Sequence, residues 1–413
     1  MHDSFRNSVY SDKISRLTIP LVIKKEGLIM DKKTSRRLLC IAMVFFWASE
    51  YCHAPYFTPY LESLGFAAQA IGVMVGAYGF TQIFARIPIG IATDAFNCYK
   101  TTILFGTIST TLSSFFLMFA TEMWSILICR VMAGLAASTW LAFSVLYNAY
   151  FKDDESVTAM TNANAFNNGG KLLAFFLGIL TATRWGYKVP LLCSFLTGLV
   201  AVVAVLLLKP IEIRHESFSF KHALDVIKTP MIIVAALFAM LPQFYMQGTA
   251  FSFTSSKAKL LGASSFVIGM ISLVFTLVQV LISPYVGKKL LKRMKNSSAV
   301  CLGLILLSLS CVSIAFANTP LLLILGNIIG GVGCLILNAL LMSLIVRSVS
   351  EEKRSTAMGF YQAVYGIGMT LGPVLMGNLV GDKGYSFAYM TIAIIMAVFA
   401  IVALPVVSKA EKK

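Results

Sequence analysis

Long apolar runs alternate with short polar breaks along the chain from about residue 38 onward. Twelve of these runs reach the length of about 20 residues that a helix needs to cross the hydrocarbon core of a bilayer. Strands are not expected, because exposed strand edges cannot be satisfied in lipid and runs of this length exceed barrel strands. The predicted spans are 39–60, 69–92, 101–120, 124–148, 159–182, 187–209, 230–254, 265–287, 298–317, 319–346, 355–380 and 385–408.

The second six spans repeat features of the first six. An offset of 197 residues places Gln82 on Gln279, and an offset of 198 places Gly186 on Gly384. Membrane transporters are commonly built from such repeats, with the binding site between them near the middle of the bilayer. We therefore predict an all-α integral membrane protein of twelve transmembrane helices in two pseudo-symmetric six-helix halves.

This pattern divides the chain into five parts. Residues 38–209 and 230–408 form the two halves, and residues 210–229 form a cytoplasmic linker between them. Residues 1–37 are expected to be a basic cytoplasmic tail, with Met30 as an alternative start, and residues 409–413 a short second tail. The apolar run inside the first tail is too short to span a bilayer or to act as a signal segment.

Composition excludes a soluble globular protein. The chain is 58% hydrophobic and 13% charged, with a mean hydropathy of +0.80, whereas soluble domains carry about 25% charged residues. The net charge of +16 does not predict a nucleic-acid partner, because no aqueous domain that could carry a basic face is visible. The eight cysteines show no short paired spacing, so we expect no metal site, no disulfide and no cofactor.

The distribution of Lys and Arg predicts the orientation in the membrane. Of the 34 Lys and Arg residues, 26 fall on the side of the N-terminus and five on the opposite side. The positive-inside rule therefore places both termini in the cytoplasm, and we expect a multi-pass protein of the cell's inner (plasma) membrane. The basic run 288–295 is interpreted as a juxtamembrane anchor against anionic lipid.

Local motifs add a family resemblance to this pattern. The stretch from Gly90 to Asp94, GIATD, resembles the GxxxD turn that follows the second span in the major facilitator superfamily. Arg86 begins an RxPxG pattern like that of the drug and small-solute branches, and Arg130 begins RVMAG, which resembles the RxxxG motif of span four. In the family this turn stabilises one conformational state, so the resemblance implies a latch formed by Arg86, Gly90 and Asp94.

The sequence also departs from the family pattern. Ala95 stands where the family has a basic residue after the Asp, and span five carries Lys171 in place of the GP motif of the antiporter branch. The resemblance implies a secondary active transporter of a small organic solute, proton-coupled and working by alternating access. A multidrug/proton efflux antiporter is the alternative, and a non-transporting membrane receptor with a transporter fold is a more distant one.

The expected partners follow from this interpretation. They are a small-molecule substrate of anionic or amphipathic character, protons and the lipid bilayer, and a monomer is expected. No nucleophile–base constellation, metal-spaced His pair or phosphate-binding loop occurs among the spans, so an enzyme is not expected.

Glu50 and His53 are the predicted proton-coupling residues. Glu50 is the one acid of eighteen in the middle of a predicted span, and His53 follows it on the same helical face. A medium of low dielectric disfavours the charged form of a carboxyl group, which suits reversible proton binding. The alternative is a static ion pair of Glu50 with Lys171 or Arg130.

Lys171 and Arg130 are the charged candidates for substrate binding. A lysine in the middle of a span needs an anion, which would be Glu50, a substrate carboxylate or phosphate, or both in turn. Arg130 would either contact the substrate or orient span four through backbone carbonyls. The uncharged candidates are aromatic and amide side chains of spans one, four, seven and eleven, for which helix packing is the alternative role: Tyr51, Trp140, Tyr245, Gln247, Tyr361, Gln362 and Tyr365.

The predicted topology can be tested with reporter fusions. Reporters placed after Lys413 or within residues 151–156 should read cytoplasmic, and one placed near Glu122 should read external, because the basic loops stay on the cytoplasmic side. A reporter after Lys413 that reads external would contradict the count of twelve spans.

Overall fold

A computed structural model describes residues 32–151, 156–209, 229–349 and 354–412. The predicted tail up to residue 31, with the alternative start at Met30, lies outside the described residues. So do residues 210–228 of the predicted linker.

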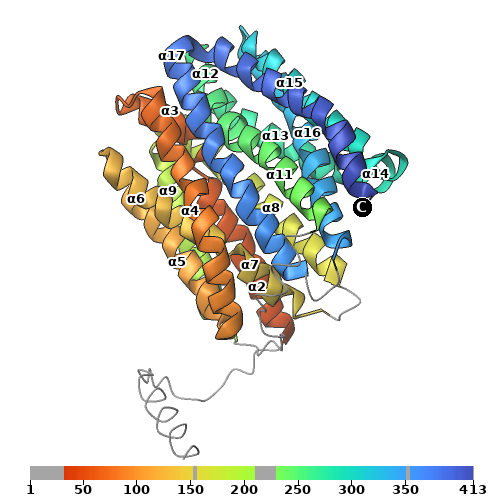
Figure 1. Cartoon of the computed structure of the whole chain (residues 1–413). Coiled ribbons are helices and arrows are strands. Elements are labelled where there is room, and N and C mark those ends of the chain that lie inside the picture. Colours follow the sequence, from red (N-terminus) through yellow and green to blue (C-terminus); the bar gives the residue numbers. More distant parts are fainter. Residues whose placement is uncertain (1–31, 152–155, 210–228, 350–353, 413) are drawn as a thin grey trace, which may run out of the picture.

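Helices cover all twelve predicted spans in the described residues, which confirms the predicted fold class (Figure 1). The first half consists of α2 (Lys32–Tyr51), α3 (Ala54–Ser63), α4 (Ala68–Ala95), α5 (Tyr99–Leu117), α6 (Met123–Ser138), α7 (Trp140–Asn148), α8 (Ser156–Trp185) and α9 (Val189–Leu206). The second half consists of α11 (Pro230–Tyr245), the π-helix η2 (Met246–Phe253), α12 (Thr254–Leu260), α13 (Ser265–Tyr285), η3 (Val286–Leu290), α14 (Leu291–Arg293), α15 (Asn296–Ala315), α16 (Pro320–Arg347) and α17 (Arg354–Glu411).

Nine helical stretches of the described residues are long and apolar enough to cross a membrane by length and composition, with α17 counted once. The other two predicted spans are α5 and α8, which carry more polar side chains. Buried Thr and Ser residues lie along α5, and α8 contains several Asn residues and Lys171. These polar groups lower the mean hydropathy of helices whose length still suits a membrane span.

Three of the predicted spans are broken near their middle. Span one divides into α2 and α3 around His53, and span four divides into α6 and α7 at Thr139. Pro55 lies at the start of α3, where proline is tolerated because the first helical N–H groups have no partner in the helix. In span seven the chain changes to the π-helix η2, a geometry that often marks functional sites.

Helix α17 contains both of the last two predicted spans. Its backbone leaves the helical region at Gly384, where φ is 80° and ψ is 174°, a conformation that glycine adopts without a steric penalty. Gly186, its counterpart at an offset of 198, has a φ of 86° at the matching turn of the first half. The internal repeat therefore extends to the backbone conformation of these turns.

Side-chain contacts also repeat between the halves. The Ser113 hydroxyl donates a hydrogen bond to the carbonyl oxygen of Cys129 at 2.7 Å. At an offset of 197, the Ser310 hydroxyl donates to the carbonyl oxygen of Gly326 at 2.6 Å. Spans three and four are therefore joined in the same way as spans nine and ten, which agrees with two related halves.

The halves meet where α4 lies beside the first part of α17 (Figure 1). A Cβ atom added at Gly72 would lie 2.5 Å from the carbonyl oxygen of Pro373, and one added at Gly79 would lie 2.7 Å from the backbone of Met369. Small residues let helices approach this closely in membranes. A second contact between the halves joins α8 to α13.

The outside of the bundle is apolar. Large side chains such as Phe84, Leu281 and Ile401 are 62%, 68% and 71% exposed. A soluble monomer rarely shows apolar surface on this scale, which marks contact with lipid or with another protein. With the span lengths, this surface agrees with an integral membrane protein.

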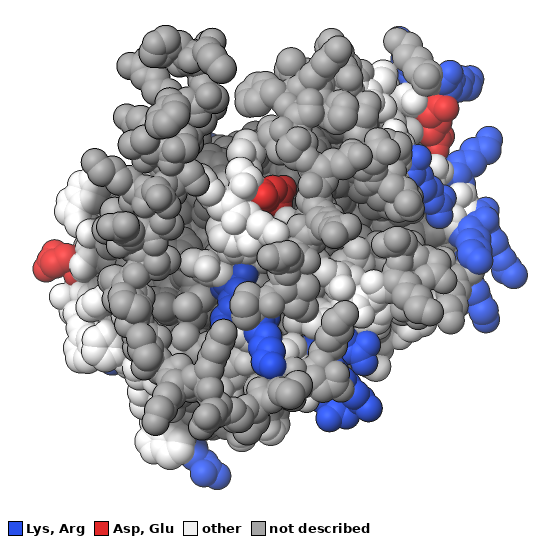
Figure 2. Space-filling model, turned by 90° about the horizontal axis from the view of Figure 1, so that it is seen from below, with Lys and Arg blue, Asp and Glu red and all other residues white. Residues whose placement is uncertain are grey.

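Basic side chains gather at the end of the bundle where α2 begins, which we call the N-terminal end; the opposite end is the far end. Figure 2 shows this end with Lys and Arg side chains collected along one side. In the run after α13, Lys289, Lys292, Arg293 and Lys295 are exposed. Their position at one end agrees with the predicted juxtamembrane anchor.

The close packing of α17 on α11 can be tested by its effect on stability. A Cβ atom at Gly368 would lie 2.1 Å from the carbonyl oxygen of Met240, so Gly368→Ala should destabilise the fold by about 1–3 kcal/mol through overpacking. The apparent melting temperature of the purified protein in detergent measures this change.

Gly359→Ala is the matched control on the same helix. No atom lies within 4 Å of a Cβ atom added there, and alanine favours helix over glycine. Its melting temperature should be unchanged or slightly raised. Equal losses for the two variants would contradict the described approach of α11 and α17.

Candidate functional site

A cavity of about 200 Å³ lies between the two halves. Side chains from α2, α4, α7 and α8 line it from the first half, and side chains from α11, η2, α16 and α17 line it from the second. Six predicted substrate-binding residues are among them: Tyr51, Trp140, Lys171, Tyr361, Gln362 and Tyr365. The cavity therefore brings together predicted residues from spans one, four, five and eleven.

Lys171 reaches this cavity from α8 beside two aromatic rings. Its Nζ atom lies 5.2 Å from the centroid of Trp47 and 5.0 Å from that of Tyr51. Such cation–π contacts stabilise an ammonium group by about 0.5–2 kcal/mol. Trp140 extends this group, since its ring packs edge-on against Trp47 at 5.2 Å.

The structure does not bring Lys171 and Glu50 into an ion pair. Within the described residues, the one ion pair with an N–O distance of 4.0 Å or less joins Lys259 to Glu62 at 3.7 Å. Lys171 lines the larger cavity and Glu50 lines a smaller pocket. The two residues lie on different helices whose facing sides cannot be deduced from the sequence alone.

Arg86, expected at the latch, is a buried residue of the larger cavity. Its guanidinium donates hydrogen bonds to the side-chain oxygens of Gln82 and Gln362 and to the Tyr365 hydroxyl, the last at 3.2 Å. Gln362 and Tyr365 belong to α17, so Arg86 connects the two halves. All three acceptors are neutral.

Gly90 and Asp94 continue along α4 beyond Arg86. The Asp94 carboxylate accepts a hydrogen bond from the Tyr99 hydroxyl at 2.7 Å, within the same half. An added Cβ atom at Gly90 would contact Leu141, also in the first half. These contacts of Gly90 and Asp94 thus lie within one half, whereas Arg86 contacts both halves.

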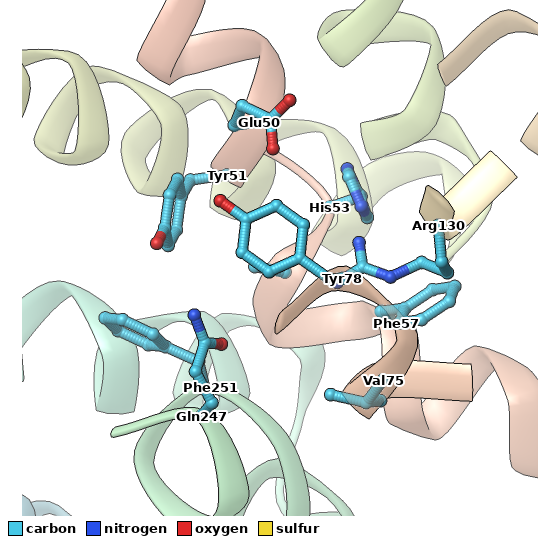
Figure 3. A pocket seen from close by; sticks show the side chains of 10 residues that line it. Glu50, Tyr51, His53, Phe57, Val75, Tyr78, Arg130, Gln247 and Phe251 are labelled. Atoms are coloured by element: carbon cyan, nitrogen blue, oxygen red, sulfur yellow. The ribbon is translucent and has the colours of Figure 1, made fainter. Parts of the chain in front are cut away.

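Glu50 lines a separate pocket of about 30 Å³ (Figure 3). His53, Arg130 and Gln247 line the same pocket. Figure 3 shows the ring of Tyr78 lying amid these groups, next to Glu50 and Arg130. The pocket has room for water, which needs about 10–15 Å³, but not for an organic solute.

The charges of this pocket are held without a close ion pair. Glu50 and Arg130 are 6% and 8% exposed, and within the described part of the chain Glu50 Oε1 and Arg130 Nε have no hydrogen-bond partner. The Glu50 carboxylate interacts with the Thr110 and Tyr78 hydroxyls and is attracted by the positive charge of Arg130. The guanidinium itself lies 4.9 Å from the ring centroid of Tyr78 and 5.1 Å from that of Phe57.

His53 lies at the break between α2 and α3. Its Nδ1 atom is 3.0 Å from the Ser194 hydroxyl of α9, with donor and acceptor set by the tautomer. The ring also packs edge-on against Phe57 at 5.7 Å. His53 therefore lines the pocket of Glu50 while its Nδ1 is engaged by another span.

The two candidates from span seven lie differently. Gln247, on η2, lines the small pocket and interacts with the hydroxyl of Tyr51. Tyr245 is fully buried, and its hydroxyl lies 2.6 Å from the Ser310 hydroxyl. Neither cavity is lined by Tyr245, whose observed contacts are those of a packing residue.

Tyr78 was missed by the sequence analysis, although it lines both the cavity and the pocket. Tyr51 is the other residue that lines both. The spacing of four residues from Tyr78 to Gln82 and from Gln82 to Arg86 places all three on one helical face. The four-residue spacing from Tyr78 to Gln82 and on to the charged Arg86 was the sequence signal that could have identified Tyr78 as a site residue.

Comparisons with known proteins agree with this architecture. The family model described as Major Facilitator Superfamily matches residues 39–256 and, a second time, residues 231–413. The chain belongs to the major facilitator superfamily. The first match covers the first half and extends into span seven, and the second match covers the second half. Membership makes the protein a multi-pass membrane transporter with a small-molecule substrate.

Three proteins that are similar to this chain share little sequence identity with it. An uncharacterized MFS-type transporter of Methanocaldococcus jannaschii is 22% identical over 375 residues, which cover 84% of this chain and 92% of that protein. The crystal structure of the nucleoside transporter NupG is similar with a TM-score of 0.71 at 18% identity, covering 93% of this chain and 100% of that one. An inward-facing bacterial homolog of the human lysosomal transporter Spinster gives a TM-score of 0.73 at 13% identity, covering 94% and 98%. At these identities the solved structures establish the fold alone.

The separation of the two sites predicts which charges are energetically coupled. In a double-mutant cycle of Glu50→Gln and Arg130→Gln, the coupling energy should be about 0.5–3 kcal/mol, because the two groups share one buried pocket. The matched cycle of Glu50→Gln and Lys171→Gln should give less than about 0.5 kcal/mol. Unfolding of the purified protein in detergent supplies the four stabilities of each cycle. A larger coupling to Lys171 than to Arg130 would contradict the described arrangement.

Proposed function

We propose that the protein is a proton-coupled secondary transporter that moves a small organic solute by alternating access. The observation that carries the proposal is the position of Glu50 beside, but outside, a cavity between two repeated halves. Tyr51 and Tyr78 line both spaces. A change of charge at Glu50 would therefore act on side chains that also face the solute.

The cavity between the halves supports the alternating-access part of the proposal. At the far end of the bundle, hydrogen bonds and one ion pair join the halves. Lys259 contacts Glu62 at 3.7 Å and donates to the carbonyl oxygen of Pro59 at 3.1 Å, and the Thr58 and Ser252 hydroxyls lie 3.0 Å apart. An exposed ion pair of this kind contributes only about 0–1 kcal/mol, which suits a contact that must open and close.

The N-terminal end supports the same assignment. The polar turn there directs Asp94 toward Tyr99 of its own half. The far end is thus joined across the halves by several polar contacts, whereas the described contacts of Gly90 and Asp94 stay within the first half. With the orientation proposed from the basic residues, both termini are cytoplasmic, and a state closed at the far end would open toward the cytoplasm.

The burial of Glu50 supports its role as the proton site. A buried carboxylate without a close cation is favoured in its neutral form, since desolvation penalises the charge. Arg130, held over two rings in the same pocket, favours the charged form. Opposing effects of this kind let a modest rearrangement between two states change proton affinity, which coupling to a proton gradient requires.

A multidrug/proton efflux antiporter remains the second candidate, on the resemblance of the RxPxG turn. The charges of the cavity disfavour lipophilic cations as its cargo. Within the part of the chain that the structure describes, its lining residues include Arg86 and Lys171 and no Asp or Glu, and two positive charges repel a cationic solute.

Transport by reconstituted protein tests the proton-coupled function. A ligand found by thermal-shift screening of metabolite and drug collections would be loaded in radiolabelled form into proteoliposome assays, since ligands that bind the folded state raise its apparent stability. The wild type should accumulate or extrude the ligand in response to an imposed pH gradient. Glu50→Gln should retain exchange of ligand across the membrane and lose the response to the gradient, because the amide cannot release a proton.

Glu122→Gln is the matched control, because Glu122 is exposed at the start of α6. This variant should respond to the gradient as the wild type does. A full response in Glu50→Gln would remove Glu50 from proton coupling. A protein that binds ligand but shows neither exchange nor flux would favour the receptor hypothesis.

A further inference from the structure

Two cations face the cavity between the halves, and within the described residues no acid neutralises them there. Lys171 and Arg86 both belong to its lining, which contains no Asp or Glu among the described residues. A cation in an apolar bundle is costly unless it is paired. This charge imbalance is a property of the cavity that the transport proposal does not by itself explain.

The contacts of each cation leave its charge available. Lys171 lies beside the faces of Trp47 and Tyr51, which attract a cation without neutralising it. Arg86 donates to neutral oxygens of Gln82, Gln362 and Tyr365. An anion would gain charge-assisted hydrogen bonds from both groups, and these are roughly twice as strong as neutral ones.

We propose that this cavity binds an organic anion, whose carboxylate or phosphate is recognised by Lys171 and Arg86 and whose apolar body packs against Trp47 and Trp140. The inference rests on the proposed function, because it takes the cavity as the solute site. It goes further by naming the chemical class of the solute and by assigning Arg86, expected at the latch, to substrate binding.

The rest of the lining fits such a ligand. Amide side chains of Asn164, Asn167, Gln243 and Asn338 also face the cavity, and the Oδ1 atom of Asn167 is buried with no partner in the described part of the chain. Amides supply donors for the remaining anion oxygens and acceptors for hydroxyl or amino groups of the ligand. A few placed polar groups on an apolar wall are typical of small-molecule sites.

Binding at Arg86 would also reach the contact between the halves. Two of its acceptors, Gln362 and Tyr365, lie on α17, while Arg86 lies on α4. An anion that takes a guanidinium N–H from either acceptor weakens the bond across the two helices. The ligand would thereby change the strength of the contact between α4 and α17, on which the proposed rocking of the halves depends. It would shift the equilibrium between two conformational states by as much as its affinities for them differ.

Ligand binding by the purified wild-type protein in detergent is the first test. The probes are two aromatic anions, phenyl phosphate and benzoate, their neutral counterparts benzyl alcohol and benzamide, the cation benzylamine, and inorganic phosphate. At least one aromatic anion should raise the melting temperature in a concentration-dependent way. Its effect should exceed those of the neutral and cationic probes and of inorganic phosphate.

Variants then assign the preference to the two cations. Lys171→Gln and Arg86→Gln should each weaken binding of the aromatic anion by roughly tenfold or more, as expected for the loss of a hydrogen bond to a charged group. Lys171→Arg should retain most of the affinity. Lys292→Gln, which removes an exposed positive charge outside the cavity, is the control and should bind as the wild type does.

Each result decides the inference. Equal shifts from anionic and neutral probes, no shift from either aromatic anion, or undiminished binding by the Lys171→Gln variant would overturn it. If Arg86→Gln does not fold, the probe series and the Lys171 variants still decide. Anion binding without flux would contradict the proposed function and leave this inference standing. Flux of a neutral solute by a protein that does not bind the anions would support the proposed function and overturn this inference.

Discussion

The cost of placing charge inside an apolar bundle is the constraint on which the interior of this transporter depends. The structure offsets this cost at Arg130 and Lys171 with aromatic faces and at Glu50 with hydroxyls, without close ion pairs. A tight buried pair would stabilise one arrangement strongly, since breaking it costs about 3–5 kcal/mol. Weaker and shared contacts leave the charges able to exchange partners, as the proposed coupling to protons requires. The same interior would be a poor choice for a static scaffold.

Helix irregularities bring these charges to the cavity and to its neighbouring pocket. The break after α2 lies next to Glu50, the break at Thr139 precedes Trp140, and η2 contains Gln247. Each irregularity leaves backbone groups outside the regular α-helical pattern, which is tolerated in a membrane where protein or a polar cavity surrounds it. Glycine contacts such as Gly72 on α17 keep the regular parts close. Closely packed regular helices on either side of these breaks thus position the side chains of the cavity and of the neighbouring pocket.

The spans and the repeat could be predicted because hydrophobic length and fixed offsets are local properties of the sequence. Gly186 and Gly384, which the offset of 198 aligns, share a positive φ. The partners of the charges could not be predicted in the same way. Residue count places Glu50 and Lys171 at similar depths, but their separation into two spaces depends on how α2 and α8 are rotated about their axes. The position of Arg86 likewise depends on α17, which lies far away in the sequence and supplies its acceptors.

The repeat also shows that the two halves share a scaffold but not its charges. At an offset of 197, Glu50 corresponds to Gln247 and Arg130 to Asn327. Asn327 is fully buried and donates to the carbonyl oxygen of Leu323 at 2.8 Å, so the second half satisfies at least this donor of its amide locally. The serine contacts between neighbouring spans are the same in both halves, which means that packing does not require the charges. One half retains ionisable groups at a desolvation cost where the other half has neutral amides, and this difference is better explained by the chemistry of these groups than by the fold.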